Sequence, residues 1–186
     1  LTLPMTAIQI LWINMVTVVA LGLTLAFEPT EPGTMARPPR KATESLLSRT
    51  LLWRIVFVSF LFVIGAFGIF FYAIDRGQSV DMARTMVVNT IVVMEIAYLF
   101  SVRFVYGRSL TWRGLLGTPA VLAGVAITVL AQLAFTYLPV LQSVFATEPI
   151  ARHDWLLIIG IGVALLILVE LEKAILGFFA RRRVAK

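Results

Sequence analysis

Residues 55–74 read IVFVSFLFVIGAFGIFFYAI, a run of twenty positions without a charged side chain. An α-helix rises about 1.5 Å per residue, so such a run reaches roughly 30 Å, the thickness of the hydrocarbon core of a bilayer. Arg54 precedes the run and Asp75 follows it. The stretch therefore predicts a membrane-spanning helix with a charged residue at each end.

Four more segments share this pattern. Residues 1–27 carry no charge, and Glu95 is the one charge within residues 85–102. The uncharged run 114–147 is too long for one span, and Pro139 marks its expected exit from the bilayer. The predicted spans are 4–27, 51–74, 83–103, 115–137 and 155–179, with a loop at 28–49 after the first. We therefore expect an all-α fold, a polytopic transmembrane bundle of five spanning helices.

The composition excludes several other classes of protein. Of the 186 residues, 60% are hydrophobic and 14% are charged, and the mean hydropathy is +0.94. A soluble domain carries closer to about 25% charged residues. A soluble enzyme, a disordered chain and a nucleic-acid-binding domain are therefore disfavoured, and we expect a multi-pass integral membrane protein whose partner is the lipid bilayer. Because the chain has no cysteine, it has no disulfide and no thiolate metal site.

The lysines and arginines predict the orientation. The opposite loops hold three of them, Arg76, Arg84 and Arg152, whereas twelve lie on the other side. The twelve are Arg37, Arg40, Lys41, Arg49, Arg103, Arg108, Arg113, Lys173, Arg181, Arg182, Arg183 and Lys186. By the positive-inside rule, the loop 28–49 and the C-terminus are expected in the cytoplasm. We expect the arginines at 181–183 to hold the tail at the anionic inner leaflet.

The first span contains two oxygen-bearing side chains that could bind a cation. Asn14 and Thr17 are three residues apart and share a helical face. An amide carbonyl and a hydroxyl are suitable ligands for a hard cation. Alternatively, both side chains hydrogen-bond a neighbouring helix. Val18, four residues after Asn14, offers no oxygen on that side.

Glu95 is the only acidic residue well inside a predicted span. A carboxylate at this depth either binds an ion or proton or makes a structural hydrogen bond, and both interpretations remain open. Asn89 lies six residues earlier, which is not a same-face spacing on a helix. Nearer the inner end of the last span, Glu170 and Lys173 are three residues apart and are expected to pair as anchors.

The sequence contains no motif for hydrolytic chemistry. A nucleophile elbow, a phosphate-binding loop, a metalloprotease motif and a DKTGT-type phosphorylation sequence are all missing from it. We therefore expect no catalytic residue and no cofactor-binding residue in this segment. The chain opens Leu-Thr-Leu-Pro, without an initiator methionine or a basic segment, so we expect no signal peptide and a piece of a longer protein.

Three short stretches carry a resemblance to a known family. Residues 4–17 read PMTAIQILWINMVT, residues 26–29 read AFEP, and residues 35–40 read MARPPR. Together they resemble the sixth transmembrane helix and the following loop of P-type cation-transporting ATPases of the calcium-pump type. The resemblance continues through 85–95 and 155–183, which are similar to the eighth and tenth helices. It covers essentially the whole chain, as helices six to ten.

The resemblance implies a set of metal ligands. Asn14 and Thr17 match ion ligands on the family's sixth helix, and Glu95 matches the carboxylate on its eighth. The calcium pumps have an aspartate where this sequence has Val18. The family therefore implies a calcium-like transported cation, but with one bound ion, a less charge-demanding ion, or compensation from other helices.

The resemblance also implies partners outside this segment. In the family, Mg-ATP acts through phosphorylation, nucleotide and actuator domains that lie upstream, so this part cannot pump alone. The loop 28–49 would contact the phosphorylation domain, and the cell membrane is the expected location. Two alternatives that need no ATP coupling are half of a helical transporter and a membrane scaffold module.

Overall fold

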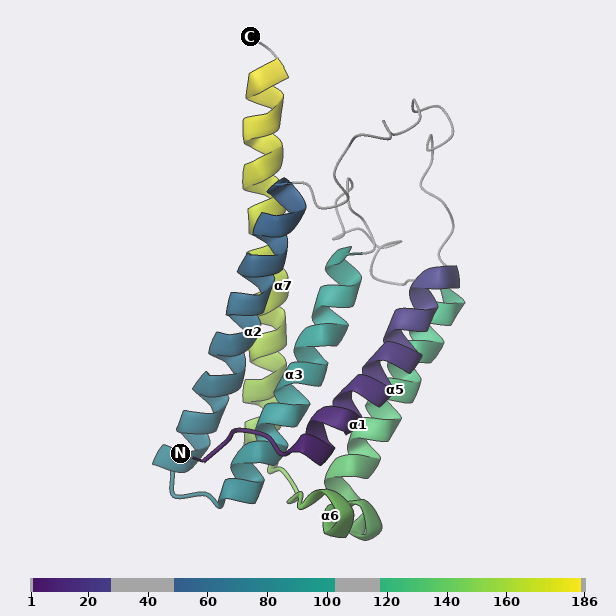
Figure 1. Ribbon diagram of the computed structural model, residues 1–186, viewed down its shortest axis with the longest axis vertical. Helices are drawn as coiled ribbons and strands as arrows, with labels where there is room; N and C mark the ends of the chain where they lie inside the picture. Colours follow the sequence, from purple (N-terminus) through teal and green to yellow (C-terminus); the bar gives the residue numbers. More distant parts are fainter. Residues whose placement is uncertain (1, 28–48, 103–117, 185–186) are drawn as a thin grey trace.

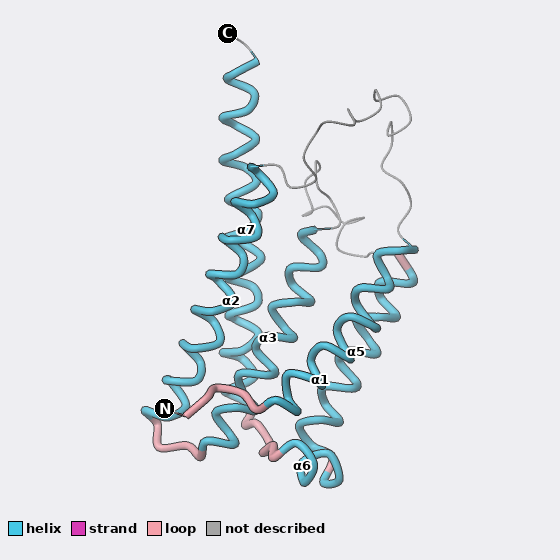
Figure 2. Tube along the Cα trace, viewed as in Figure 1, coloured by secondary structure: helices cyan, strands magenta, loops and turns pink. Residues whose placement is uncertain are grey.

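The computed structural model describes residues 2–27, 49–102 and 118–184, and within these ranges all regular structure is helical. The first helix, α1 (Ala7–Thr17), continues as the π-helix η1 (Val18–Gly22) and the 3-10 helix η2 (Leu23–Phe27). The other elements are α2 (Arg49–Asp75), α3 (Val80–Val102), α5 (Pro119–Tyr137), α6 (Pro139–Phe145) and α7 (Arg152–Val184). Figure 2 shows short loops between α2 and α3 and between α6 and α7. The expected all-α class is confirmed.

Four of the described helices are long and apolar enough to cross a membrane. They are Leu51–Asp75, Val80–Val102, Pro119–Tyr137 and Arg152–Gly177. The first expected span is also helical, but its apolar part, Ala7–Gly22, is shorter than the other four. It continues to Phe27 with a changed winding. The expected loop 28–49 lies outside the described residues except for Arg49.

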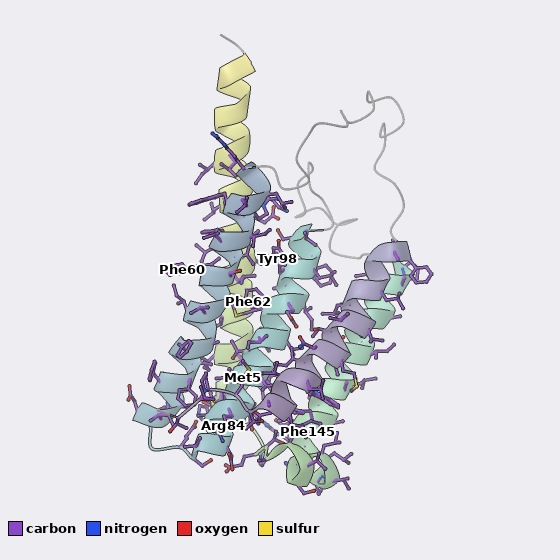
Figure 3. The ribbon with its side chains drawn as sticks, viewed as in Figure 1. Met5, Phe60, Phe62, Arg84, Tyr98 and Phe145 are labelled. Atoms are coloured by element: carbon purple, nitrogen blue, oxygen red, sulfur yellow. The ribbon has the colours of Figure 1, made fainter. Side chains whose placement is uncertain are left out.

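The two ends of the bundle differ. The turn between α2 and α3, the helix α6, and the first residues of α1 and α7 gather at one end, here called the α6 end, while the C-terminus lies at the other (Figure 1). The α2–α3 turn uses Gly77, whose φ of 72° is in the left-handed region that favours glycine. Arg84 and Phe145, labelled in Figure 3, mark the α6 end. Arg84 Nε donates there to the Leu3 carbonyl oxygen at 3.1 Å.

The helix α3 is the most enclosed element, because α2, α7 and α1 all pack against it. Two glycines allow the neighbouring helices α2 and α7 to approach α3 closely. A Cβ added at Gly65 of α2 would lie 2.7 Å from Met94 Sδ, and one at Gly162 of α7 would lie 2.6 Å from Val93 Cγ1. Small residues at such contacts bring helix backbones together, which is how helices associate in lipid.

The helices α1 and α5 run side by side in a second group (Figure 1). Their contact is closest at Gly124, where an added Cβ would lie 2.4 Å from the carbonyl oxygen of Ala20. The backbone of α5 therefore touches η1 directly, without an intervening side chain.

Large apolar side chains cover the outside of the bundle. Phe60, Phe67 and Phe71 of α2 and Leu156 of α7 are all exposed, and Phe60 points away from the other helices in Figure 3. A soluble monomer rarely exposes so many apolar residues, whereas lipid is a suitable solvent for them. The chain is a multi-pass integral membrane protein.

Candidate functional site

The α6 end of α1 is held by side chains of α5 and α6. Gln9 is fully buried, and its Nε2 donates to the Phe145 carbonyl oxygen at 2.9 Å. The Trp12 ring stacks on Phe135 with centroids 5.4 Å apart, and it meets the Phe145 ring edge-on at 5.0 Å. Trp12 Nε1 also donates to Gln132 Oε1 at 3.3 Å. These contacts fix α1, here called the anchored segment, against the α5–α6 hairpin.

The winding of this first helix changes at Val18. From there to Phe27 the chain forms the π-helix η1 and then the 3-10 helix η2, which together are here called the irregular segment. The backbone N–H of Val18 is shared between the carbonyl oxygens of Asn14 and Met15. Short π-helical stretches inside helices are rare overall, but those that occur are often found at functional sites. The change of winding falls at the position where the calcium-pump resemblance expects an aspartate.

The side chains of Thr17 and Glu95 meet at the boundary between these segments. Thr17 is buried on α1 and its side chain lies near the Glu95 carboxyl on α3, but the structure shows no hydrogen bond between these two side chains. The Thr17 hydroxyl lies 2.9 Å from the Ile13 carbonyl oxygen, to which it donates. A hydroxyl proton serves one acceptor at a time, and Glu95 Oε2 is buried without a hydrogen-bond partner among the described residues. The pair is therefore an incomplete oxygen site.

Asn14 lies elsewhere on the helix. Its side chain is exposed, and no hydrogen bond joins it to another described side chain. Val18, one turn further on, is 66% exposed on the same side of the helix. The structure thus brings Thr17 to Glu95 and leaves Asn14 on the open face of α1. Within this chain the three residues predicted as metal ligands do not converge on one point.

A second set of buried polar side chains joins α3 to α5. Asn89 is fully buried, and its Nδ2 donates to the Thr85 carbonyl oxygen at 2.8 Å and to Thr136 Oγ1 at 3.0 Å. Gln132, one turn before Thr136, binds Trp12 as described above. The sequence reasoning did not single out Gln132 or Thr136. Their four-residue spacing inside an apolar run is the signal that would have indicated a shared polar face.

An ionic cluster lies toward the end of the bundle opposite α6. Arg54 of α2 and Glu172 of α7 form an ion pair at 3.3 Å, and both side chains are largely buried. Glu170 accepts from Lys173 at 2.9 Å, which confirms the predicted pair. Glu170 also accepts from Ser101 Oγ at 2.8 Å, and Lys173 donates to the Ser101 carbonyl oxygen. The cluster joins α2, α3 and α7 and pairs charges that would be costly in lipid, although Arg54 Nε and Glu172 Oε1 have no hydrogen-bond partner among the described residues.

The part of the chain that the structure describes contains no cluster of three or more histidine, cysteine or acidic side chains that could hold a metal ion by itself. A cation at Glu95 would therefore need neutral oxygens or ligands from other segments. That requirement fits a site of which α1 and α3 form only one side.

Comparison with known proteins identifies the family of this chain. A family model described as "Cation transporting ATPase, C-terminus" matches residues 2–175. The chain is similar to "Probable cation-transporting ATPase F" of Mycobacterium tuberculosis, with 43% identity over 91% of this chain and 19% of that protein.

Two further relatives have names that specify calcium. The first is "Calcium-transporting ATPase type 2C member 2" of Mus musculus, with 31% identity over 97% of this chain and 19% of the relative. The second is "Calcium-transporting ATPase" of Bacillus subtilis, with 31% identity over 87% of this chain and 18% of the relative. The chain thus spans less than a fifth of the length of these relatives. It belongs to the P-type cation-transporting ATPases, as part of their C-terminal membrane region.

Proposed function

We propose that this chain supplies one side of the cation-binding site of an ATP-driven pump, with Glu95 as the charged ligand and Thr17 as a neutral one. The observation that carries the proposal is the Glu95 carboxyl, which lies within the bundle beside Thr17 with Oε2 unpartnered among the described residues. An acidic oxygen at membrane depth is unfavourable unless a cation, a proton or a donor satisfies it. A transported cation would do so during each cycle.

The remaining ligands belong to segments upstream of this chain. Asn14 is the third proposed ligand, and it lies on the open face of α1. A helix packed on that face would complete the coordination between Asn14 and the irregular segment. The relatives are about five times as long as this chain, so upstream helices are available for this role. Mg-ATP would act through the cytoplasmic domains of the same parent protein.

The transported ion is proposed to be calcium or a cation of similar chemistry. Two relatives carry calcium in their names. Val18 provides no oxygen, so this part of the site holds one carboxylate rather than two. A site with fewer negative charges binds a divalent cation more weakly, unless upstream helices add ligands. We therefore propose a single ion coordinated on this side.

The topology follows from the distribution of basic residues. The loop 28–49 and the C-terminus are placed in the cytoplasm, where that loop would contact the phosphorylation domain. Four prolines in this loop, Pro29, Pro32, Pro38 and Pro39, restrict its backbone and would help transmit movement to α1. The proposed location is the cell membrane.

The test is a cation screen of ATP hydrolysis by the full-length protein in reconstituted vesicles. The proposal expects hydrolysis that a specific divalent cation stimulates, that vanadate inhibits, and that accompanies uptake of the same ion. Uptake driven by an ion gradient without ATP would instead support the helical-transporter alternative. Failure of every cation to stimulate turnover would support the scaffold alternative.

A further inference from the structure

A cavity of about 250 Å³ lies between α3, α5 and α7. Val92 and Ile96 form its α3 wall, Val129 and Leu133 form much of its α5 wall, and Trp155 of α7 lies at one end. Its lining therefore extends from the first turn of α7 to the middle of α3. Neither Thr17 nor Glu95 lines the cavity.

The Trp155 end of the cavity lies at the membrane interface. Trp155 Nε1 donates to the Tyr137 hydroxyl at 2.7 Å, and that hydroxyl donates to the Ile150 carbonyl oxygen at 2.8 Å. Tryptophan and tyrosine concentrate at the headgroup level of bilayers, because their rings are apolar and their N–H or O–H groups are polar. The cavity thus begins near the headgroups and continues into the hydrocarbon.

The lining of this cavity suits an acyl chain rather than water. Its walls are almost entirely aliphatic, and an apolar cavity of this kind does not retain water. Val129 and Leu133 are 42% and 41% exposed, so the α5 wall is continuous with the outer, lipid-facing surface. An acyl chain can enter from that side without crossing a polar barrier.

One polar group in the wall lacks a partner. Gln132 lines the cavity and is 4% exposed. Its Oε1 accepts from Trp12, but its Nε2 has no hydrogen-bond partner among the described residues. An amide donor buried in apolar surroundings is destabilising until an acceptor reaches it. Gln132 lies five residues before the end of α5, about 7.5 Å deeper than Tyr137 along the helix.

We propose that this cavity binds one bilayer lipid from the leaflet at the α6 end, with an acyl chain along Val92 and Ile96 and an ester carbonyl accepting from Gln132 Nε2. An ester carbonyl lies just below the headgroup, as Gln132 lies just below the aromatic pair. The ligand class is a diacyl glycerolipid. The bound chain fills the space between the α1–α5 pair and the α2–α3–α7 group.

The test uses the full-length protein in nanodiscs that contain a phosphatidylglycerol with a photoactivatable group in the middle of one acyl chain. After irradiation, peptide mapping should place the label on the segments around 92–96 and 129–133. Val129→Trp fills the cavity mouth and should lower this labelling at least about tenfold, because the indole takes the space of the acyl chain and removes its dispersion contacts with the walls.

The matched control is Ile127→Trp on the same helix, because Ile127 is 59% exposed and does not line the cavity. It should leave cavity labelling unchanged. Labelling spread evenly over all lipid-facing helices, or equal labelling in both tryptophan variants, would overturn the proposal.

The role of Gln132 is tested by comparing ester-linked with ether-linked photolipids, since an ether has no carbonyl oxygen. The ester lipid should label the cavity about threefold more strongly in the wild type, as expected for one weak hydrogen bond in a membrane. The ratio should fall to one in Gln132→Leu. Because both lipids are compared within the same variant, the ratio does not depend on how much protein is folded. Equal labelling of the wild type by both lipids would overturn the assignment of the ester carbonyl to Gln132.

Discussion

The anchored segment and the irregular segment are consecutive parts of one helix, yet they are built differently. The anchored segment is a regular α-helix that begins with a capping box between Thr6 and Gln9. Its Trp12 contacts two aromatic rings and a glutamine. The irregular segment has π-helical and 3-10 winding and exposes Val18, Val19 and Leu23. The anchored segment is therefore held by aromatic rings and polar side chains. The irregular segment is held by the buried side chain of Leu21, which packs with Leu99 and Val121, and by its close contact with α5 at Gly124.

This difference shows where the helix can change shape at least cost. Breaking the anchored segment requires the loss of aromatic packing and several hydrogen bonds. Rewinding the irregular segment requires a change in backbone hydrogen bonds that are already irregular. Thr17 and Glu95 lie at the boundary, so a change in winding would alter the proposed cation site while the α6 end of the helix stays in place. Each of the following predictions tests one side of this comparison.

The largest effect is expected from Trp12→Ala, which breaks the anchored segment. The variant loses two aromatic contacts worth about 1 kcal/mol each and a hydrogen bond worth roughly 0.6 kcal/mol, so the stability of the full-length protein should fall by about 2.5 kcal/mol. Reversible unfolding in detergent measures the change. The control is Leu156→Ala, a lipid-exposed residue of α7, which should have little effect. An equal loss of stability in both variants would show that Trp12 stabilises the protein no more than a lipid-exposed residue does.

The second-largest effect is expected from Gly124→Ala, which disturbs the contact between α5 and the irregular segment. The added Cβ would lie 2.4 Å from the Ala20 carbonyl oxygen and 2.3 Å from Thr24 Cγ2. Such overpacking should cost about 2 kcal/mol of stability in the same assay and should also weaken cation affinity. Gly160→Ala is the matched control, because an added Cβ there meets nothing within 4 Å. Unchanged stability in Gly124→Ala would mean that α5 does not constrain η1.

Glu95→Gln tests the boundary between the two segments. It removes the one carboxylate of the proposed site while keeping nearly the same shape, and the half-saturating cation concentration for ATP hydrolysis should rise at least about tenfold, equivalent to about 1.4 kcal/mol. The control is Asp75→Asn, an exposed carboxylate at the end of α2. A normal cation dependence in Glu95→Gln would remove Glu95 from the site.

The smallest effect is expected from Thr17→Val, which removes one neutral oxygen at the same boundary. Cation affinity should fall about threefold, as for the loss of a ligand bond worth roughly 0.6 kcal/mol. Thr24→Val is the matched control. Thr24 is also buried, and its hydroxyl donates to the Leu21 carbonyl oxygen at 2.6 Å, but Thr24 lies in the irregular segment. Equal effects of the two substitutions would indicate a general role of threonine in helix winding rather than a ligand role.

The sequence predicted the helices well because hydropathy is a local property. Runs of about twenty apolar residues identify spans wherever they pack, and the Glu170–Lys173 pair follows from a three-residue spacing on one helix. Glu95 was identified because a lone carboxylate in an apolar run is conspicuous without any knowledge of its neighbours. These features need no information about which helices meet.

The sequence was less informative about the surroundings of each polar residue. Asn14 and Thr17 are close enough in sequence to share a face, but the nearest helix contacts the side of α1 that holds Thr17 and leaves Asn14 exposed. The Asn89–Thr136 hydrogen bond joins residues 47 positions apart, so it depends on the packing of α3 against α5. The π-helical winding at Val18 has no signature in hydropathy, because it changes the backbone and not the apolar pattern.

The Arg54–Glu172 ion pair has a consequence for how the protein is made. The two residues are 118 positions apart, so α2 enters the bilayer long before its partner in α7 has been synthesised. A lone charge costs up to about 3 kcal/mol at the centre of a spanning helix and less near an end, where Arg54 lies, and Arg54 lacks its Glu172 partner until the last helix arrives. The ion pair between α2 and α7 therefore forms only after the last helix has been inserted. Ribosomes that stop before residue 172 would release chains with an unmatched arginine, which membrane quality control can recognise as unfinished.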